Sequence, residues 1–301
     1  ENYQIHGTFD DIDNKMHWGN IVAQAGVNYR VSPDMTAEFT AAFTRFFSSM
    51  KHTDKSTIYS GVEKRIFDSY LKTDNNINDW ILRGDFDWHA SERSHVRFGA
   101  GYTRHSFLPG RSSKKFITES DEVVLRDSTW AFRANELNGY IEDDWKINDR
   151  WRINAGLHAS LFHIDGKVKG GLSPRLSASY RPAENYAVKG AYSRTVQYVH
   201  QLTECYMQLP SDQWIPIVGK FKPQTADKIS AGAYWQSEGQ KYTVAVEGYW
   251  KWMHNLLDYR FEHYLSPPME KWDSRLTSGK GTAKGIDVTI EKRSGKITGH
   301  I

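Results

Sequence analysis

Histidine supplies the clearest candidates for metal binding or acid–base chemistry in this sequence. The chain has 12 histidines, but no two of them show the HxxxH or HExxH spacing that brings two imidazoles to one metal ion. Several fall in segments where apolar and polar residues alternate. Such a distribution is more typical of scattered polar histidines than of a haem or metal site. We therefore predict no bound metal and no cofactor.

Other reactive side chains also lack the arrangement that catalysis requires. The one cysteine, Cys205, has no partner in the chain for a disulfide and is interpreted as an incidental loop residue. The run Gly279-Lys280-Gly281 lacks the spacing of a phosphate-binding loop. Glu142 and Asp144 would share one face of a strand, where we expect a salt bridge to a separate domain packed on that face rather than general acid–base catalysis. The chain is therefore predicted not to be an enzyme.

Aromatic and charged side chains gather in two long segments, residues 197–223 and 254–281. These side-chain types are suited to stacking on a ligand and to recognising its charge. The alternative interpretation is that they pack the two segments against each other. The candidate ligand-binding residues are His200, Tyr206, Trp214, Tyr259, Arg260, Tyr264 and Trp272.

These candidates depend on a scaffold of strands, which alternation predicts over most of the chain. In residues 19–31, Ile21, Val27 and Tyr29 share one face, while Gln24 and Arg30 share the other. The same pattern recurs through residues 35–44, 79–105, 136–161, 176–192, 229–250 and 286–290. Residues 3–9 are interpreted as a further strand, followed by a short gap at residues 11–15. The pattern gives about 13 strands in all.

The connections between these strands alternate in length. Short turns are predicted near residues 32–34, 91–94, 148–150, 182–185, 237–240 and 293–295. Long gaps, at residues 48–77, 109–133, 197–223 and 254–281, separate most of the hairpins, with a short one at 165–173. Short turns on one side and long loops on the other are typical of an outer-membrane barrel. Trp and Tyr flank several turns, which suits rings at the depth of the lipid headgroups.

We therefore predict an all-β fold, an antiparallel transmembrane β-barrel in the bacterial outer membrane, with the long loops extracellular and outer-membrane lipid around it. No segment approaches the run of about 20 apolar residues that a membrane helix needs. The mean hydropathy of −0.65 is polar, as expected when half of each strand faces a polar interior. The net charge of +3 with scattered Lys and Arg argues against nucleic-acid binding. A soluble all-β binding module remains the alternative.

Four runs of sequence make the prediction more specific. They are SPRLSASYRPAENYAVKGAYSRTVQYVHQLTE from Ser173, WIPI with KPQTADKISAGAYW at 214–217 and 222–235, VEGYWKWMHNLLDYR at 246–260, and GKGTAKGIDVTIEKRSGKITGHI at 279–301. Their order and spacing resemble the barrel region of TonB-dependent receptors, in particular a branch common in Bacteroidetes. The resemblance is good over residues 173–301 and rests on pattern alone before residue 134.

The resemblance implies a barrel of about 22 strands closed by an N-terminal plug domain. Residues 1–301 would be a fragment of that barrel, without the plug, a TonB box or the last strands. It further implies a receptor that imports a scarce nutrient with energy from the TonB–ExbB–ExbD complex, which acts through the plug. A siderophore, cobalamin, a glycan and a peptide all remain open as ligands, as does a surface lipoprotein that covers the barrel. A passive porin, an adhesin or an outer-membrane enzyme is the alternative.

Overall fold

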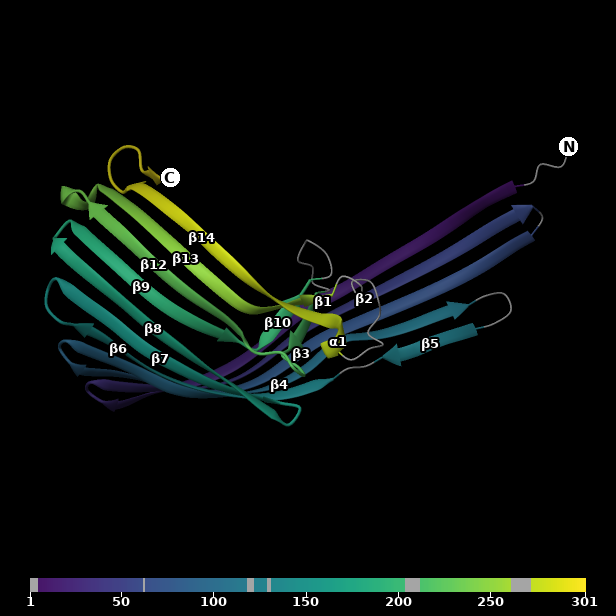
Figure 1. Cartoon of the computed structure of the whole chain (residues 1–301), viewed down its shortest axis with the longest axis horizontal. Coiled ribbons are helices and arrows are strands. Elements are labelled where there is room, and N and C mark those ends of the chain that lie inside the picture. Colours follow the sequence, from purple (N-terminus) through teal and green to yellow (C-terminus); the bar gives the residue numbers. More distant parts are fainter. Residues whose placement is uncertain (1–4, 62, 118–121, 129–130, 204–211, 261–271) are drawn as a thin grey trace.

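The computed structural model describes residues 5–61, 63–117, 122–128, 131–203, 212–260 and 272–301. Figure 1 shows a strongly curved sheet whose first strands extend far beyond the others. In the described ranges, helix is confined to η1 (Glu238–Gln240) and α1 (Trp272–Arg275). No helix in these ranges is long and apolar enough to cross a membrane.

The main sheet places its strands in the order β1-β2-β3-β4-β6-β7-β8-β9-β12-β13-β14-β15, and β5 pairs only with β4. Neighbouring strands are antiparallel throughout, and β10 and β11 form a separate two-stranded sheet. The bounds are β1 Ile5–Ser32, β2 Met35–Gly61, β3 Glu63–Ser91, β4 Ser94–Ile117, β5 Glu122–Ser128, β6 Phe132–Lys146, β7 Trp151–Ile164, β8 Lys167–Ala183, β9 Tyr186–Gln197, β10 Val199–Leu202, β11 Gln213–Pro216, β12 Gln224–Gln236, β13 Tyr242–Tyr259, β14 Leu276–Lys292 and β15 Gly299–His300.

Short turns join consecutive strands along one edge of the sheet, which we call the turn edge. The turns lie at residues 33–34, 92–93, 147–150, 184–185, 237–241 and 293–298, and Figure 1 shows them together on the left. The six turns predicted from the sequence are therefore confirmed. The opposite edge, which we call the loop edge, carries the long connections.

The two faces of the sheet differ as the alternation predicts. The outer face carries large apolar side chains that remain exposed, among them Val27, Ile141 and Leu172, each more than half exposed. At the turn edge this face ends in the exposed aromatic residues Tyr29, Trp88, Trp145, Trp151 and Tyr186. Contiguous apolar surface of this extent is unfavourable in water, so the outer face is suited to lipid and its aromatic border to the headgroup layer.

The first strand differs from the prediction. β1 runs from Ile5 to Ser32 without interruption and pairs with β2 over almost its whole length. The separate strand predicted at residues 3–9 and the gap at 11–15 are therefore wrong. Apart from Ile12, residues 11–15 are polar or charged, a composition that predicts a break between strands. In the structure their backbone groups pair with residues 51–55 of β2, and that pairing does not depend on apolar side chains.

Two segments predicted as long loops contain regular structure. Most of residues 48–77 belongs to the far ends of β2 and β3, which form one long hairpin. Residues 109–133 include the end of β4 and its partner β5. The gap predicted at 165–173 shrinks to a two-residue turn, Asp165-Gly166, with φ of 50° and 70°. Asp-Gly adopts such a turn readily because both residues tolerate positive φ.

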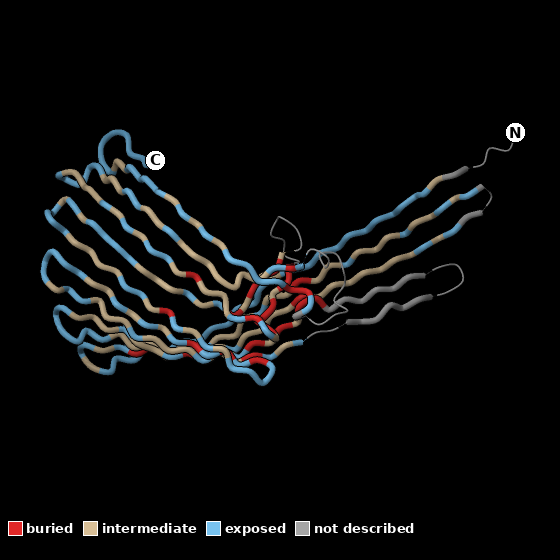
Figure 2. The backbone as a smooth tube through the Cα atoms, in the orientation of Figure 1, coloured by how far each residue is buried: buried red, intermediate tan, exposed pale blue. Residues whose placement is uncertain are grey.

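An insert between β9 and β12 packs against the inner face near the loop edge. We define the insert as described residues 198–203 and 212–223, which include β10 and β11. Its Leu202, Ile215 and Ile217 are fully buried in a cluster with Phe107 and Phe162 of the main sheet. Figure 2 shows most of the buried residues gathered at this crossing. The hydrophobic core of the described chain therefore lies where the insert meets the sheet.

Aromatic stacking and a buried hydrogen bond hold the insert in place. The rings of Phe162 in β7 and Tyr198 in the insert stack with centroids 4.9 Å apart. The Tyr198 hydroxyl lies 2.8 Å from the Ser160 hydroxyl, and the Lys169 ammonium donates to the Phe221 carbonyl at 2.7 Å. Asn75 in β3 donates from Nδ2 to the Asp212 carbonyl at 2.6 Å. These contacts connect the insert to three strands of the sheet.

Candidate ligand-binding site

A pocket of about 580 Å³ lies between the insert and the first strands of the sheet. Its insert wall is formed by Gln201 and Trp214, and its sheet wall combines aromatic with polar side chains. Aromatic faces beside carboxylate and amide groups are suited to a small organic molecule. The lining residues are Trp18, Asn20, Ile21, Val22, Thr44, Arg45, Phe46, Ile77, Asp79, Gln201 and Trp214.

A buried histidine fixes the carboxylate of this pocket. Asp79 Oδ1 lies 2.8 Å from His105 Nδ1, and Glu136 Oε2 lies 3.6 Å from His105 Nε2. The His105 ring is buried and stacks on Phe107 at a centroid distance of 5.5 Å. The three residues come from β3, β4 and β6, which the antiparallel register places side by side. Asp79 is therefore oriented before any ligand arrives.

Three of the predicted ligand-binding residues meet at the insert. Trp214 is half-buried and lines the pocket. His200 and Tyr259 are buried at 4% exposure each. The Tyr259 hydroxyl lies 3.0 Å from Gln213 Oε1, next to Trp214 in the chain. The structure thus places Trp214 at the pocket and buries His200 and Tyr259, and a ligand contact for these two residues remains a prediction.

The other predicted residues do not join this pocket. Arg260 is exposed, and its backbone N–H donates to the Arg275 carbonyl at 2.8 Å. Tyr206 and Tyr264 lie outside the described residues. Trp272 is the first residue of α1, but its side chain lies outside the described part of the chain. A ligand contact for any of these four residues remains a prediction.

The environment of His200 determines its ionisation. His200 pairs with Ile215 across the β10–β11 hairpin, and its Nε2 atom has no hydrogen-bond partner in the described structure. Burial lowers the pKa of His200 from 6.5 to about 4, and a side-chain hydrogen bond with Gln224 opposes that change only in part. The imidazole is therefore neutral at neutral pH, which is compatible with its apolar surroundings.

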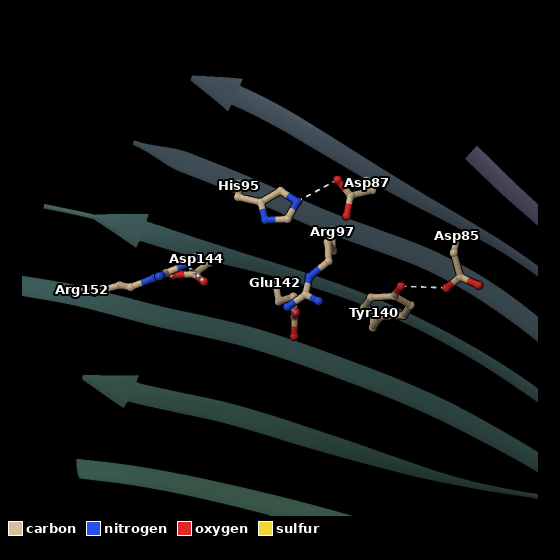
Figure 3. Close-up of polar contacts among 8 residues, drawn as sticks. All are labelled: Asp85, Asp87, His95, Arg97, Tyr140, Glu142, Asp144 and Arg152. Carbon is tan, nitrogen blue, oxygen red and sulfur yellow. Dashed lines mark hydrogen bonds and ion pairs between the residues drawn. The ribbon is translucent and has the colours of Figure 1, made fainter. Parts of the chain in front are cut away.

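Nearer the turn edge, the inner face carries a ladder of polar contacts that Figure 3 shows in close-up. Arg97 pairs with Glu142, and Arg152 donates to both oxygens of Asp144 at 2.5 and 2.6 Å. Asp85 accepts hydrogen bonds from Arg83 and from the Tyr140 hydroxyl. Glu142 and Asp144, for which a partner on a separate domain is predicted, pair here with Arg97 and Arg152 of neighbouring strands, and a contact with that domain remains a prediction.

Trp18, Phe46 and Asp79 line the pocket, although the sequence did not predict them as ligand-binding residues. Alternation offered one signal, because Trp18 falls at an inner-face position, two residues before Asn20. Phe46 adjoins the segment that was interpreted as a loop, so no face could be assigned to it. From the sequence alone, Asp79 cannot be distinguished from the many other inner-face carboxylates, because only the strand register places His105 beside it.

Comparison with known proteins supports the fold. No curated protein matches the chain. The FrpB iron transporter of Neisseria meningitidis matches with a TM-score of 0.57 and 12% identity over 93% of this chain and 51% of its own. The RagAB peptide importer matches with a TM-score of 0.58 and 8% identity, covering 95% and 35%. The siderophore receptor PirA of Pseudomonas aeruginosa gives 0.51 and 13%, covering 92% and 54%.

The family comparison agrees with the architecture. This chain spans about half the length of the FrpB and PirA chains, and at these identities the likeness concerns the fold. A family model for the β-barrel of TonB-dependent receptor-like proteins matches residues 2–297, nearly the whole sequence. Together with the lipid-suited outer face and the polar inner face, this match establishes that the chain belongs to the TonB-dependent receptor-like β-barrel family of the outer membrane.

Proposed function

We propose that this chain is the barrel part of a receptor that binds a scarce nutrient at the cell surface and imports it into the periplasm. The pocket between the insert and β1–β3 carries the proposal, because it opens on the inner face near the loop edge. A ligand bound there would lie inside the barrel wall, as import requires. Transport rather than catalysis also fits the family to which the chain belongs.

The energy source in this proposal is the TonB–ExbB–ExbD complex, which would act through a plug region of the parent protein. Membership of the TonB-dependent receptor-like family supports this coupling. Uptake of the nutrient should stop in a strain that lacks TonB. Unchanged uptake in that strain would instead support the passive porin.

The chemistry of the pocket favours a small organic ligand with a flat or conjugated part. Trp18, Phe46 and Trp214 offer ring faces, and Asp79 with Asn20 offers hydrogen-bond acceptors. Siderophores fit this description, and two of the structural matches are a siderophore receptor and an iron transporter. Cobalamin, a glycan and a peptide remain within the proposal, since the RagAB match is a peptide importer.

The experiment combines a growth screen with two tryptophan variants of the parent protein. Growth under iron limitation, and with cobalamin, glycans or peptides as the limiting nutrient, identifies the ligand. Trp214→Ala should then weaken ligand binding, whereas Trp80→Ala on the outer face should not. Equal binding by both variants would remove the pocket from the proposal. A surface lipoprotein that covers the barrel is tested separately, by co-purification with the tagged parent.

A further inference from the structure

A second group of residues on the inner face has the chemistry of a metal site. Asp87 and His89 lie near the end of β3, and His95 lies at the start of β4, across the turn at residues 92–93. One ligand atom from each of the three residues can be chosen so that all lie within 4.8 Å of one another. We propose that Asp87, His89 and His95 bind a divalent transition-metal ion at the turn edge. This site is separate from the pocket of the proposed function.

The fold brings the three side chains together for a local reason. Residues two apart on a strand point to the same face, so Asp87 and His89 both project from the inner face. The tight turn folds β4 back along β3, and the pairing shifts between Trp88 and Ser91. His95 therefore reaches Asp87, with Nε2 2.7 Å from Asp87 Oδ1, as Figure 3 shows. The His89 and His95 rings stack at a centroid distance of 4.2 Å.

Charge also distinguishes Asp87 from the other carboxylates of the ladder. Asp85, Glu142 and Asp144 each have an arginine partner. Among the described residues, the ion pairs found for Asp87 are with His89 and His95, at 3.6 and 2.7 Å. Metal ions bind the neutral form of imidazole. A bound dication would therefore supply the positive charge that arginine supplies to the neighbouring carboxylates.

The geometry needs only a small adjustment. Ligand bonds of about 2.1 Å in a tetrahedral site place donor atoms roughly 3.4 Å apart. The distances from Asp87 Oδ1 to His89 Nδ1, 3.6 Å, and to His95 Nε2, 2.7 Å, lie on either side of that value. The His89 side chain is 66% exposed, so solvent leaves room for it to shift towards a metal ion. Two imidazoles and one carboxylate favour Zn²⁺, Ni²⁺, Cu²⁺ or Fe²⁺ over Ca²⁺ and Mg²⁺, and leave a fourth position for water.

The test measures Zn²⁺ binding to the detergent-purified parent protein, prepared with an affinity tag that contains no histidine. We expect about one equivalent of Zn²⁺ with micromolar or tighter affinity, and each of Asp87→Asn and His95→Ala should weaken it at least about tenfold. His158→Ala removes a histidine of β7 that is not in the cluster and serves as the control. Parent-like affinity in the Asp87 and His95 variants, or no binding by the parent, would overturn the proposal.

A second measurement on the unaltered protein keeps the test valid if a variant fails to fold. Diethylpyrocarbonate modifies exposed imidazoles, and mass spectrometry locates the modified residues. Zn²⁺ should protect His89 and His95 while the modification of His52, on β2, remains unchanged. Equal modification of His89 and His95 with and without Zn²⁺ would contradict the site. Neither measurement requires the nutrient, so the proposed function can fail without affecting this result.

Discussion

Acidification should release the insert from the inner face, because His200 is buried there in its neutral form. The pKa of this residue is about 4 in the folded chain against an ordinary value of 6.5. Between those two pH values the open insert binds more protons than the packed insert. The stability of the packed insert is therefore complete above pH 6.5 and falls as the pH decreases towards 4.

The size of the effect follows from the same two values. A difference of about 2.5 pKa units corresponds to roughly 3 kcal/mol when the pH lies below both values. At pH 5 the linkage relation gives about 2 kcal/mol, which corresponds to an increase of about 30-fold in the open population. The insert can open without unfolding the sheet, because stability is not uniform across a protein and the insert meets the sheet over a limited cluster.

Hydrogen exchange measured by mass spectrometry tests this prediction. Peptides covering β10 and β11 should lose protection by about 30-fold between pH 7.5 and pH 5, after correction for the intrinsic exchange rate. Peptides from β7 and β8 provide the internal control and should keep their protection. His200→Gln should remove most of the pH dependence, because glutamine does not titrate. An unchanged protection of the insert at pH 5, or an equal loss in the variant, would refute the reasoning.

Two further predictions concern the sheet. Ile141→Arg on the outer face should destabilise the folded parent in lipid by about 2–4 kcal/mol, whereas Ser177→Arg on the inner face should have a much smaller effect; equal losses in urea titrations of the two variants would reverse the assignment of the faces. Gly171→Ala should be destabilising, because the added Cβ would lie 2.6 Å from Val196 Cγ1. The double variant with Val196→Ala should recover much of the loss, and additive losses in a double-mutant cycle would show that this contact is not the cause.

The sequence by itself determined most of the strands, their faces and the turn edge. In β6, Leu137, Ile141 and Trp145 alternate with polar residues, and this period of two depends only on local backbone geometry. The same regularity indicated the membrane, and the sequence runs from Ser173 onwards indicated the family that the family model then matched. The alternation of side chains along a strand and the residue types of a turn can be recognised without knowing any contact between segments distant in sequence.

Only the tertiary structure decided where the insert packs and which side chains meet on the inner face. Phe107 and Phe162 occupy inner-face positions, where alternation predicts polar contacts with water, and the insert buries them. His200 was a ligand candidate in the sequence and is a packed, neutral side chain in the structure. The physical reason is that burial and the contacts of Asp87 with His95 depend on strand register and on packing between segments distant in sequence, which a one-dimensional pattern does not contain.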